Sequence, residues 1–569
     1  MKKWKKALSC VTAFAIVASL LVGCAPSIST ETTSSQATSP SASTTPTEVD
    51  KNAPPLLPFS ESGTTLSLSC SDNGDATKSY TLNLPVFQEL EKLTGIKIDW
   101  QMTSSGDYST AMNTRIAAGQ KLPDIFAVPF GTSSDKLGKD GVAIDISGLV
   151  DEGNAFYLSR LMDMNPLVRA GITSGDGKIY SWPGFGEGII YSSEDMKTGE
   201  WRNPGANVVL YAPAIRQDWL DKVGLPVPKT LDEWHTVLTA FKTKNTSGTG
   251  KNIVPMGTLF SYKDLFNFGT AFGIYTTEPF DFKDGKAYCV RTQPEFKELL
   301  RYLNTLYTEG LIDPGFAKSD YWNSTVNLIN MNLLGAFGGT WDSNLPGYTS
   351  NLVTAGVTDA NWVPVKTPID PNGKQQTTNR WSIWKQVVIS KDCKNPELAL
   401  KWLDFQTCSP EGIDLQTYGC EGISYTVDAT GKKQLTDYVV NNPDGLGPME
   451  ALRAIGAFSQ FSNMQTTEFY EVQSPKLLVD FAQSYDKSDV RTPIAGVESF
   501  PYSDEELTQI SDFISNFNTY VDEYCCGFID GSIPFDKWDE FVNQINKFGL
   551  DNYLNLAQAG YDRFYVNVK

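Results

Sequence analysis

Three short stretches place tryptophans in glycine-rich or strand-ending contexts, next to charged or phenolic side chains that could bind a ligand. An indole ring offers a flat apolar face on which the C–H groups of a sugar stack, while carboxylates and a guanidinium bond the surrounding hydroxyls. The candidate ligand-binding residues are Tyr180, Trp182, Glu187, Trp341, Asp342, Arg380, Trp381, Trp384 and Glu421. The alternative for each tryptophan is a place in the core, since the chain contains 13 of them.

Residues for acid–base or nucleophilic catalysis are scarce. The only histidine is His235, so Ser-His-Asp and Cys-His mechanisms and zinc sites built on paired histidines have little support. We interpret His235 as a flank residue of a predicted helix. The stretch from Asp281 to Gly285 lacks the alternating ligands and closing glutamate of a calcium loop, and we interpret it as a turn. The sequence thus predicts no catalytic residue, no metal site and no cofactor.

The cysteines do not form the pattern of a disulfide framework. The chain has nine; with Cys10 and Cys24 assigned to the N-terminal segment described next, an odd number remains, and no C-x-x-C motif occurs. We therefore expect free thiols. A single bridge, such as one between Cys408 and Cys420, stays open as an alternative.

The N-terminus has the features of an export signal. Four lysines within the first six residues precede an uncharged apolar run over 7–22, which is too short and too weakly flanked for a comfortable transmembrane helix. The run ends in Leu21-Val22-Gly23-Cys24, which resembles the lipobox of bacterial lipoproteins. We predict that residues 1–23 are a signal peptide and that Cys24 becomes the acylated N-terminus; an ordinary signal peptide with a chance cysteine is the alternative.

Residues 24–60 are predicted to be a disordered tether between the lipid anchor and a folded body. They are rich in Ser, Thr, Pro and Ala and have almost no large apolar side chain before Leu56, so they cannot bury enough surface to offset the entropy lost on ordering. A flexible coil of about 35 residues spans on the order of 30–35 Å. The tether therefore allows the body to stand off a membrane.

The overall charge argues against one class of partner. The chain carries 47 Lys and Arg against 66 Asp and Glu, a formal net charge of −19. An acidic surface disfavours nucleic acid and anionic membrane surfaces. We therefore expect no nucleic-acid partner.

Short apolar strands alternate with amphipathic helices at the start of the folded part. Strands are predicted at 65–68, 96–100 and 125–128, with helices at 85–93 and 107–118 between them. This order indicates an α/β fold with a parallel sheet covered by helices. Farther on, Thr230 with Glu233 and Ser503 with Glu506 form the capping boxes of two helices, and the C-terminal part is strongly helical.

Several segments together resemble the extracellular solute-binding proteins of family 1, in particular the lipoproteins that serve carbohydrate ABC importers in Firmicutes. The most recognisable stretch runs from Ile215 to Pro226 and continues from Lys229 to Trp234. Further similar segments are Gly177–Tyr180, Glu309–Pro314, Ile389–Lys391, Asn395–Glu397, Tyr418–Gly422, Phe548–Asp551 and Gly560–Arg563. The resemblance covers essentially everything from about Glu61 to the end, and His235 departs from the aromatic residue expected there.

The resemblance implies a two-lobed, periplasmic-binding-protein-like α/β fold with a hinge near Pro183 and near 375–380. It places residues 61–185 and 380–425 in a first lobe and residues 186–379 and 426–569 in a second. It further implies a monomer on the extracellular face of the cell membrane that binds a carbohydrate, in particular an oligosaccharide, between the lobes and delivers it to the permease subunits. No enzymatic activity is expected. Trp341 resembles, by its place after a strand, a sugar-stacking tryptophan of maltose-binding protein.

Two other classes of function remain open from the sequence. Paired carboxylates alone suffice for a secreted glycoside hydrolase, and the chain has many acidic residues from which a pair could be drawn. A lipoprotein that binds a glycan at the cell surface without importing it is the second. Peptides or other small solutes also remain possible ligands of a binding protein.

Overall fold

The computed structural model describes residues 53–60, 63–72, 79–104, 106–185, 190–191, 211–244, 246–318, 324–378, 383–458, 465–485, 489–491, 497, 500–566 and 568. The chain separates into two units at Val49 and Asp50, and only the second is described. The predicted signal peptide and Cys24 therefore lie outside the described residues, as do most of the tether and three candidate ligand residues: Glu187, Arg380 and Trp381.

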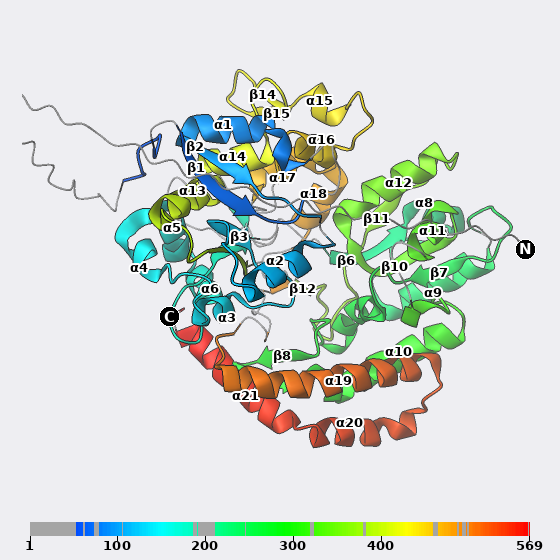
Figure 1. The fold of residues 1–569 in the computed structure, drawn as a ribbon. Helices are drawn as coiled ribbons and strands as arrows, with labels where there is room; N and C mark the ends of the chain where they lie inside the picture. The colour runs from blue at the N-terminus through cyan, green and yellow to red at the C-terminus, as the bar shows by residue number, and fades with distance from the viewer. Residues whose placement is uncertain are drawn as a thin grey trace, which may run out of the picture. The chain divides into compact units, whose positions relative to one another are not determined.

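The first sheet has five strands in the order β2-β1-β3-β13-β4 (Figure 1). The strands are β1 (Thr64–Ser69), β2 (Ile96–Trp100), β3 (Ile125–Ala127), β4 (Trp182–Phe185) and β13 (Ile383–Ile389). β1 pairs in parallel with β2 and β3, whereas β13 runs antiparallel to β3 and β4. Its main helices are α1 (Pro85–Thr94), α2 (Tyr108–Ala117), α3 (Ser134–Lys139), α5 (Phe156–Met164), α6 (Pro166–Ile172), α13 (Pro396–Cys408) and α14 (Pro410–Thr417). The predicted alternation of strands and helices is confirmed here.

The second sheet has four strands in the order β11-β6-β10-β7. They are β6 (Tyr211–Arg216), β7 (Val254–Gly257), β10 (Leu334–Trp341) and β11 (Trp362–Pro364). β10 is parallel to β7 and antiparallel to β6, which is itself antiparallel to β11. The helices on this side are α8 (Gln217–Val223), α9 (Leu231–Thr243), the 3₁₀ segment η3 (Tyr262–Phe272), α10 (Pro294–Thr308), α11 (Val326–Asn330) and α12 (Leu345–Thr354). The predicted capping box of Thr230 and Glu233 starts α9.

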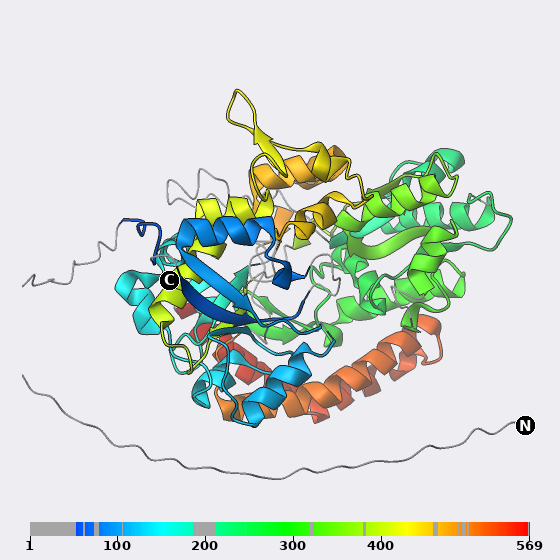
Figure 2. The same ribbon diagram turned by 45° about the horizontal axis from the view of Figure 1, so that its top comes forward.

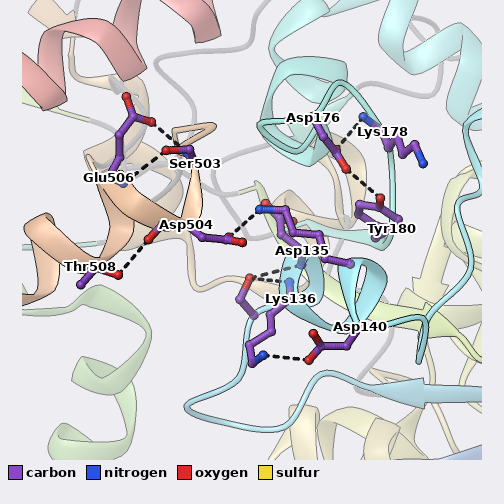
Figure 3. Close-up of polar contacts among 12 residues, drawn as sticks. Asp135, Lys136, Asp140, Asp176, Lys178, Tyr180, Ser503, Asp504, Glu506 and Thr508 are labelled. Carbon is purple, nitrogen blue, oxygen red and sulfur yellow. Dashed lines mark hydrogen bonds and ion pairs between the residues drawn. The ribbon is translucent and has the colours of Figure 1, made fainter.

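Three C-terminal helices extend the core of the second sheet. They are α19 (Asp504–Asp530), α20 (Trp538–Lys547) and α21 (Leu550–Val566). In both views α19 runs beside α10 (Figures 1 and 2), and the Asn304 side chain of α10 donates a hydrogen bond to the Ile529 carbonyl of α19 at 3.1 Å. Figure 3 shows the predicted capping box of Ser503 and Glu506 at the start of α19. None of the helices in the described part of the chain is long and apolar enough to cross a membrane.

Each sheet has its own apolar core, and the partition differs from the predicted lobe ranges in one segment. Val439, Leu452, Ile455, Phe458 and Phe469, from a stretch predicted to belong to the second lobe, pack on the core of the first sheet. The contact is made by Phe469 of α17 (Thr467–Gln473), whose ring meets Tyr418 edge-on at 4.8 Å and Phe458 at 5.5 Å. After α18 (Lys476–Gln483) the chain reaches the second sheet, where Tyr485 packs on Ala212 of β6.

Small elements complete the description. The hairpin of β14 (Tyr425–Val427) and β15 (Lys433–Leu435) projects from the body in Figures 1 and 2, followed by α15 (Asp437–Val440) and α16 (Pro448–Ala454). β8 (Phe280–Lys283) and β9 (Lys286–Cys289) form a hairpin, so the stretch from Asp281 to Gly285 contributes a turn, as predicted. Two short parallel pairs, β5 (Ile190–Tyr191) with β16 (Gln465–Thr466) and β12 (Thr377–Thr378) with β17 (Val490–Arg491), accompany the connections between the sheets.

Candidate ligand-binding site

Chain topology singles out one edge of each sheet. In the first sheet β1, β2, β3 and β4 share a direction, so their carboxyl ends lie at the edge where β13 begins. In the second sheet the carboxyl ends of β7, β10 and β11 lie at the edge where β6 begins. The connection over 186–210 runs from β4 to β6, and that over 365–382 runs from β11 to β13. Both connections therefore join the same two edges, and the carboxyl ends of strands are where open α/β sheets bind ligands.

Three partly exposed aromatic side chains meet at this edge of the second sheet. Trp341 ends β10 and pairs in the ladder with Tyr211, the first residue of β6. Their rings meet edge-on, with centroids 5.4 Å apart and planes at 82°. Phe260, in the loop after β7, is 48% exposed and lies 6.5 Å from the Tyr211 ring at an interplanar angle of 27°. We refer to Tyr211, Phe260 and Trp341 as the aromatic edge.

The glycines before Trp341 make this arrangement possible. A Cβ atom on Gly339 would lie 2.4 Å from the Asn267 side-chain nitrogen and 2.6 Å from the Tyr211 ring. Both distances are too short for real contacts, so only glycine allows η3 and Tyr211 to approach β10 this closely. Asn267 uses that approach to donate a hydrogen bond to the Gly338 carbonyl at 3.1 Å. Trp341 is the predicted residue that belongs to the aromatic edge. Asp342, also predicted, follows it directly in the sequence and is buried.

The corresponding edge of the first sheet carries two aromatic residues of a different kind. Trp384 of β13 is 39% exposed and lies across Gly184 of β4, where a Cβ atom would be only 2.3 Å from the indole nitrogen. Phe130 follows β3 and is 92% exposed; its backbone N–H donates to the Ser109 hydroxyl at 2.9 Å. These two rings face solvent at the edge that the connections join.

Trp182 and Tyr180 lie in the core and offer no ring face to a ligand in this structure. Trp182 is 1% exposed, and its indole N–H donates to the Thr407 hydroxyl at 2.9 Å. Tyr180 is also buried, with its hydroxyl directed at Asp176 at 2.7 Å (Figure 3). The reason for this difference from the prediction is that helices cover both residues where β4 joins the sheet. Glu421 is exposed in the turn before β14 and lies at none of the strand ends described above.

Sequence reasoning missed Tyr211, Phe260 and Phe130. A usable signal existed for two of them. Tyr211 opens a strand at the edge that carries Trp341, and Phe130 follows a strand at the edge that carries Trp384. Phe260 gave no such signal, since only the fold of its loop shows that its ring reaches Tyr211.

The stretch that begins at Ile215, the most recognisable one in the sequence, contributes a buried polar cluster to the fold. Arg216 is fully buried and binds both carboxylate oxygens of Asp218 at 2.7 Å, while its third nitrogen donates to Asn332 at 2.6 Å. The guanidinium also lies over the rings of Trp219 and Trp362, at 5.0 and 5.7 Å from their centroids. Bidentate pairing and stacking of this kind suit arginine rather than lysine. This cluster joins β6 to the start of α8 and does not belong to the aromatic edge.

Other reactive side chains show no assembled centre among the described residues. The seven cysteines from Cys70 onward are free thiols, including Cys408 and Cys420. Burial raises the pKa of Cys289 to about 11 and that of Cys525 to about 12. His235 is partly exposed, and its Nε2 lies 2.6 Å from a Glu309 carboxylate oxygen. Within the ranges that the structure describes, no three His, Cys, Asp or Glu residues are grouped to hold a metal ion.

Comparisons with known proteins agree with this architecture. The profile of the family described as bacterial extracellular solute-binding protein matches residues 73–409, more than half of the 569 residues. The fructooligosaccharide ABC transporter substrate-binding protein FusA of Streptococcus pneumoniae is 27% identical over 508 residues, covering 85% of this chain and 87% of FusA. A second S. pneumoniae protein, named as a carbohydrate ABC transporter substrate-binding protein, is 23% identical over 84% of this chain and 87% of its own length.

Solved structures show the same fold. An EF-hand mutant of S. pneumoniae FusA in complex with fructo-nystose superposes with a TM-score of 0.67 at 25% identity, covering 88% of this chain and 100% of that one. The alginate-binding protein AlgQ2, solved without calcium ion, gives a TM-score of 0.66 at 21% identity over 89% of this chain and 99% of its own. The α/β two-lobed fold expected from the sequence is thereby confirmed.

Proposed function

This chain belongs to the bacterial extracellular solute-binding proteins, and from that premise we propose that it binds an oligosaccharide outside the cell and delivers it to the permease of an ABC importer. The ligand class is supported by the two S. pneumoniae relatives that match most of its length, whose names specify fructooligosaccharide and carbohydrate. Family and relatives are binding proteins, which favours holding the ligand over hydrolysing it.

The observation that carries the proposal is the aromatic edge. Tyr211, Phe260 and Trp341 come from three separate segments and present rings at the carboxyl end of the second sheet. Aromatic rings bury the apolar faces of sugars, and polar groups around them fix the hydroxyls. We place the ligand between this edge and the edge of the first sheet that carries Phe130 and Trp384, so that hinge closure covers it from both sides.

The polar residues at the rim are part of the same proposal. Asp342, the residue after β10, is a candidate polar partner of the ligand because it directly follows Trp341. Glu187, Arg380 and Trp381 belong by sequence to the segments that connect the two sheets, and we propose them as further ligand partners on that ground. Trp384 supports this assignment, because it is partly exposed and lies at the start of β13, where the second of these connections ends.

We further propose that Cys24 anchors the protein to the outer face of the cell membrane through acyl chains. The support is the lysine-rich start, the apolar run and the Leu-Val-Gly-Cys sequence, together with a Bacillus subtilis relative named Lipoprotein LipO, 28% identical over 252 residues and 42% of this chain. Two or more acyl chains, at roughly 0.8 kcal/mol per buried CH₂, give stable anchoring. Cys24→Ser should release the protein into the medium. Retention of this variant in the membrane fraction with the signal cleaved would contradict the assignment.

A thermal-shift screen tests the binding function directly. A ligand that binds only the folded state raises its stability by RT ln(1 + [L]/Kd), about 2.7 kcal/mol at a hundredfold excess over Kd. The screen should contain fructooligosaccharides, other oligosaccharides, their monosaccharides and short peptides. We expect the oligosaccharides to raise the melting temperature most and to remain intact on chromatography. Stabilisation by peptides alone, or cleavage of the glycans, would contradict the proposal.

A further inference from the structure

One buried carboxylate organises two of the three rings of the aromatic edge. Asp264, near the start of η3, accepts hydrogen bonds at one oxygen from the backbone N–H groups of Leu259, Phe260 and Ser261, at 2.7, 2.9 and 3.3 Å. Its other oxygen accepts the hydroxyl of Tyr211 at 2.5 Å. The side chain is 5% exposed, and burial raises its pKa while these four hydrogen bonds lower it.

The four bonds connect segments that are far apart in the sequence. Three of them hold the loop that carries Phe260, and the fourth holds the first residue of β6. The Tyr211 ring is thereby held at its hydroxyl by Asp264, and its body contacts the exposed ring of Phe260 and the edge-on indole of Trp341. A ring fixed at both its hydroxyl and its backbone has one orientation, whereas a ring fixed only by its backbone rotates between rotamers.

Capping of η3 accounts for only part of this arrangement. Ser261 and Asp264 form the capping box of η3, in which Asp264 accepts the Ser261 N–H, while the Ser261 hydroxyl also accepts from the Lys263 N–H at 3.0 Å. The bonds from Leu259, Phe260 and Tyr211 lie outside that box. A carboxylate at this position could make its N–H bonds while remaining exposed to water. Burying it is costly unless its partners are satisfied, and the phenol of Tyr211 is the partner that a cap does not require.

We propose that Asp264, acting through the Tyr211 hydroxyl, is a positioning residue that holds the rings of Tyr211, Phe260 and Trp341 in the orientation that receives the sugar. Neither the carboxylate nor the phenol needs to touch the ligand. The inference rests on the proposed function for its consequence in binding, but the orientation of the rings can be measured without any ligand.

The variant Tyr211→Phe is the cleanest change, because it keeps the ring and removes only the hydroxyl. Tyr262→Phe is a matched control: its hydroxyl donates to Asp522 at 2.6 Å from the same segment η3, but towards α19. Asp264→Asn tests the carboxylate itself, and it is the variant at greater risk of misfolding, since three backbone donors depend on it. A result for Tyr211→Phe therefore decides the question if Asp264→Asn fails to fold.

Ring orientation is measured on ligand-free protein labelled with 5-fluorotryptophan, with the ¹⁹F resonance of Trp341 assigned through Trp341→Phe. Because the Tyr211 ring remains, broadening or a large shift of the Trp341 resonance reports movement of that ring or of the indole. We expect Tyr211→Phe to shift and broaden it, and Tyr262→Phe to leave it unchanged. An unchanged Trp341 resonance in Tyr211→Phe would overturn the inference, whatever the protein binds.

Binding is then measured by calorimetry with the oligosaccharide that gives the largest thermal shift. We expect Tyr211→Phe to lower the melting temperature, because a buried carboxylate oxygen loses its donor. Measured well below that temperature, binding should weaken about tenfold, and less than about twofold when Trp341→Ala is already present. A tenfold loss that persists in the Trp341→Ala background would mean that the phenol contacts the ligand directly, which overturns positioning. If no carbohydrate binds the unmodified protein while the resonance moves as expected, the proposed function fails and the positioning stands.

Discussion

Two buried carboxylates, Asp218 in the second half of the molecule and Asp404 in the first, are held in different ways. In the second, Arg216 binds both oxygens of Asp218 and stacks on two indoles, so each charge has an ionic partner. In the first, Asp404 of α13 is buried and accepts hydrogen bonds from the backbone N–H groups of Tyr157 and Leu158 at the start of α5, at 2.9 and 2.8 Å. Burial raises the pKa of Asp404 to about 7, and the two backbone hydrogen bonds only partly offset that rise.

The aromatic side chains at the two sheet edges also differ in how firmly the structure holds them. The aromatic edge of the second sheet is tied together by Asp264 and by ring contacts, while Phe130 on the first sheet stands almost fully in solvent. A prearranged surface loses little entropy when a ligand arrives, and an isolated exposed ring gains burial only when the ligand covers it. We therefore expect the second half to supply most of the binding free energy and the first half to supply closure.

The largest expected effect comes from breaking the ion pair. Arg216→Met should lower the free energy of unfolding by about 3–5 kcal/mol, because Asp218 would lose its buried bidentate partner. The control is Arg453→Met, which removes an exposed pair with Glu450 at 2.8 Å and should cost less than about 1 kcal/mol. Chemical denaturation measures both variants. Equal effects would show that the buried pair adds nothing beyond a surface pair.

The raised pKa of Asp404, in the first half, predicts that the free energy of unfolding depends on pH. Its pKa is about 3.9 when unfolded and about 7 when folded, so between these values the folded state binds the extra proton. Its contribution to stability is therefore present below about pH 4 and is lost, by a few kcal/mol, as pH rises through 7.

Denaturation of Asp404→Asn across pH 4 to 8 checks this expectation. The amide does not titrate, so the variant should lack this fall in stability, while Asp163→Asn, an exposed change on α5, should keep it. The variant should also be less stable than the parent at low pH by about 1–3 kcal/mol, since its NH₂ group faces a backbone donor. An unaltered pH profile would place the titration elsewhere.

Removal of the Trp341 ring tests the contribution of the aromatic edge to binding. Trp341→Ala should weaken oligosaccharide binding by about 1–3 kcal/mol through the loss of a buried aromatic contact. Trp182→Phe is the matched control from the core: it should lower the melting temperature, because the bond to Thr407 is lost, and leave the affinity unchanged. Isothermal calorimetry and differential scanning calorimetry separate the two effects. Equal affinity in Trp341→Ala and the parent would remove Trp341 from the site.

The smallest effect is expected at the first edge. Phe130→Ala should leave the melting temperature unchanged, because the ring is 92% exposed, and should weaken binding only about two- to fivefold. Leu82→Ala, at another exposed apolar side chain of the same half, should change neither quantity. A loss at Phe130 as large as that at Trp341 would reverse our assignment of the binding energy to the second half.

The sequence by itself determined the local elements and the family. Helix α1 begins at Pro85 and is closed by Gly95 as its C-cap, and the capping boxes at Thr230 and Ser503 start α9 and α19. These signals depend on residues within one turn of each other. The strand–helix alternation likewise indicated the parallel sheet, since periodicity reports which face of each element is apolar.

Only the tertiary structure decided which tryptophans face solvent and which segments share a core. Trp182 and Trp341 both stand at strand ends two residues from a glycine, yet Thr407 and its helix bury the first, while the second remains at an edge. Phe469 joined the first core because its ring meets Tyr418, and Asp264 reached Tyr211 across more than fifty residues. Burial depends on what packs from elsewhere in the chain, and no local pattern carries that information.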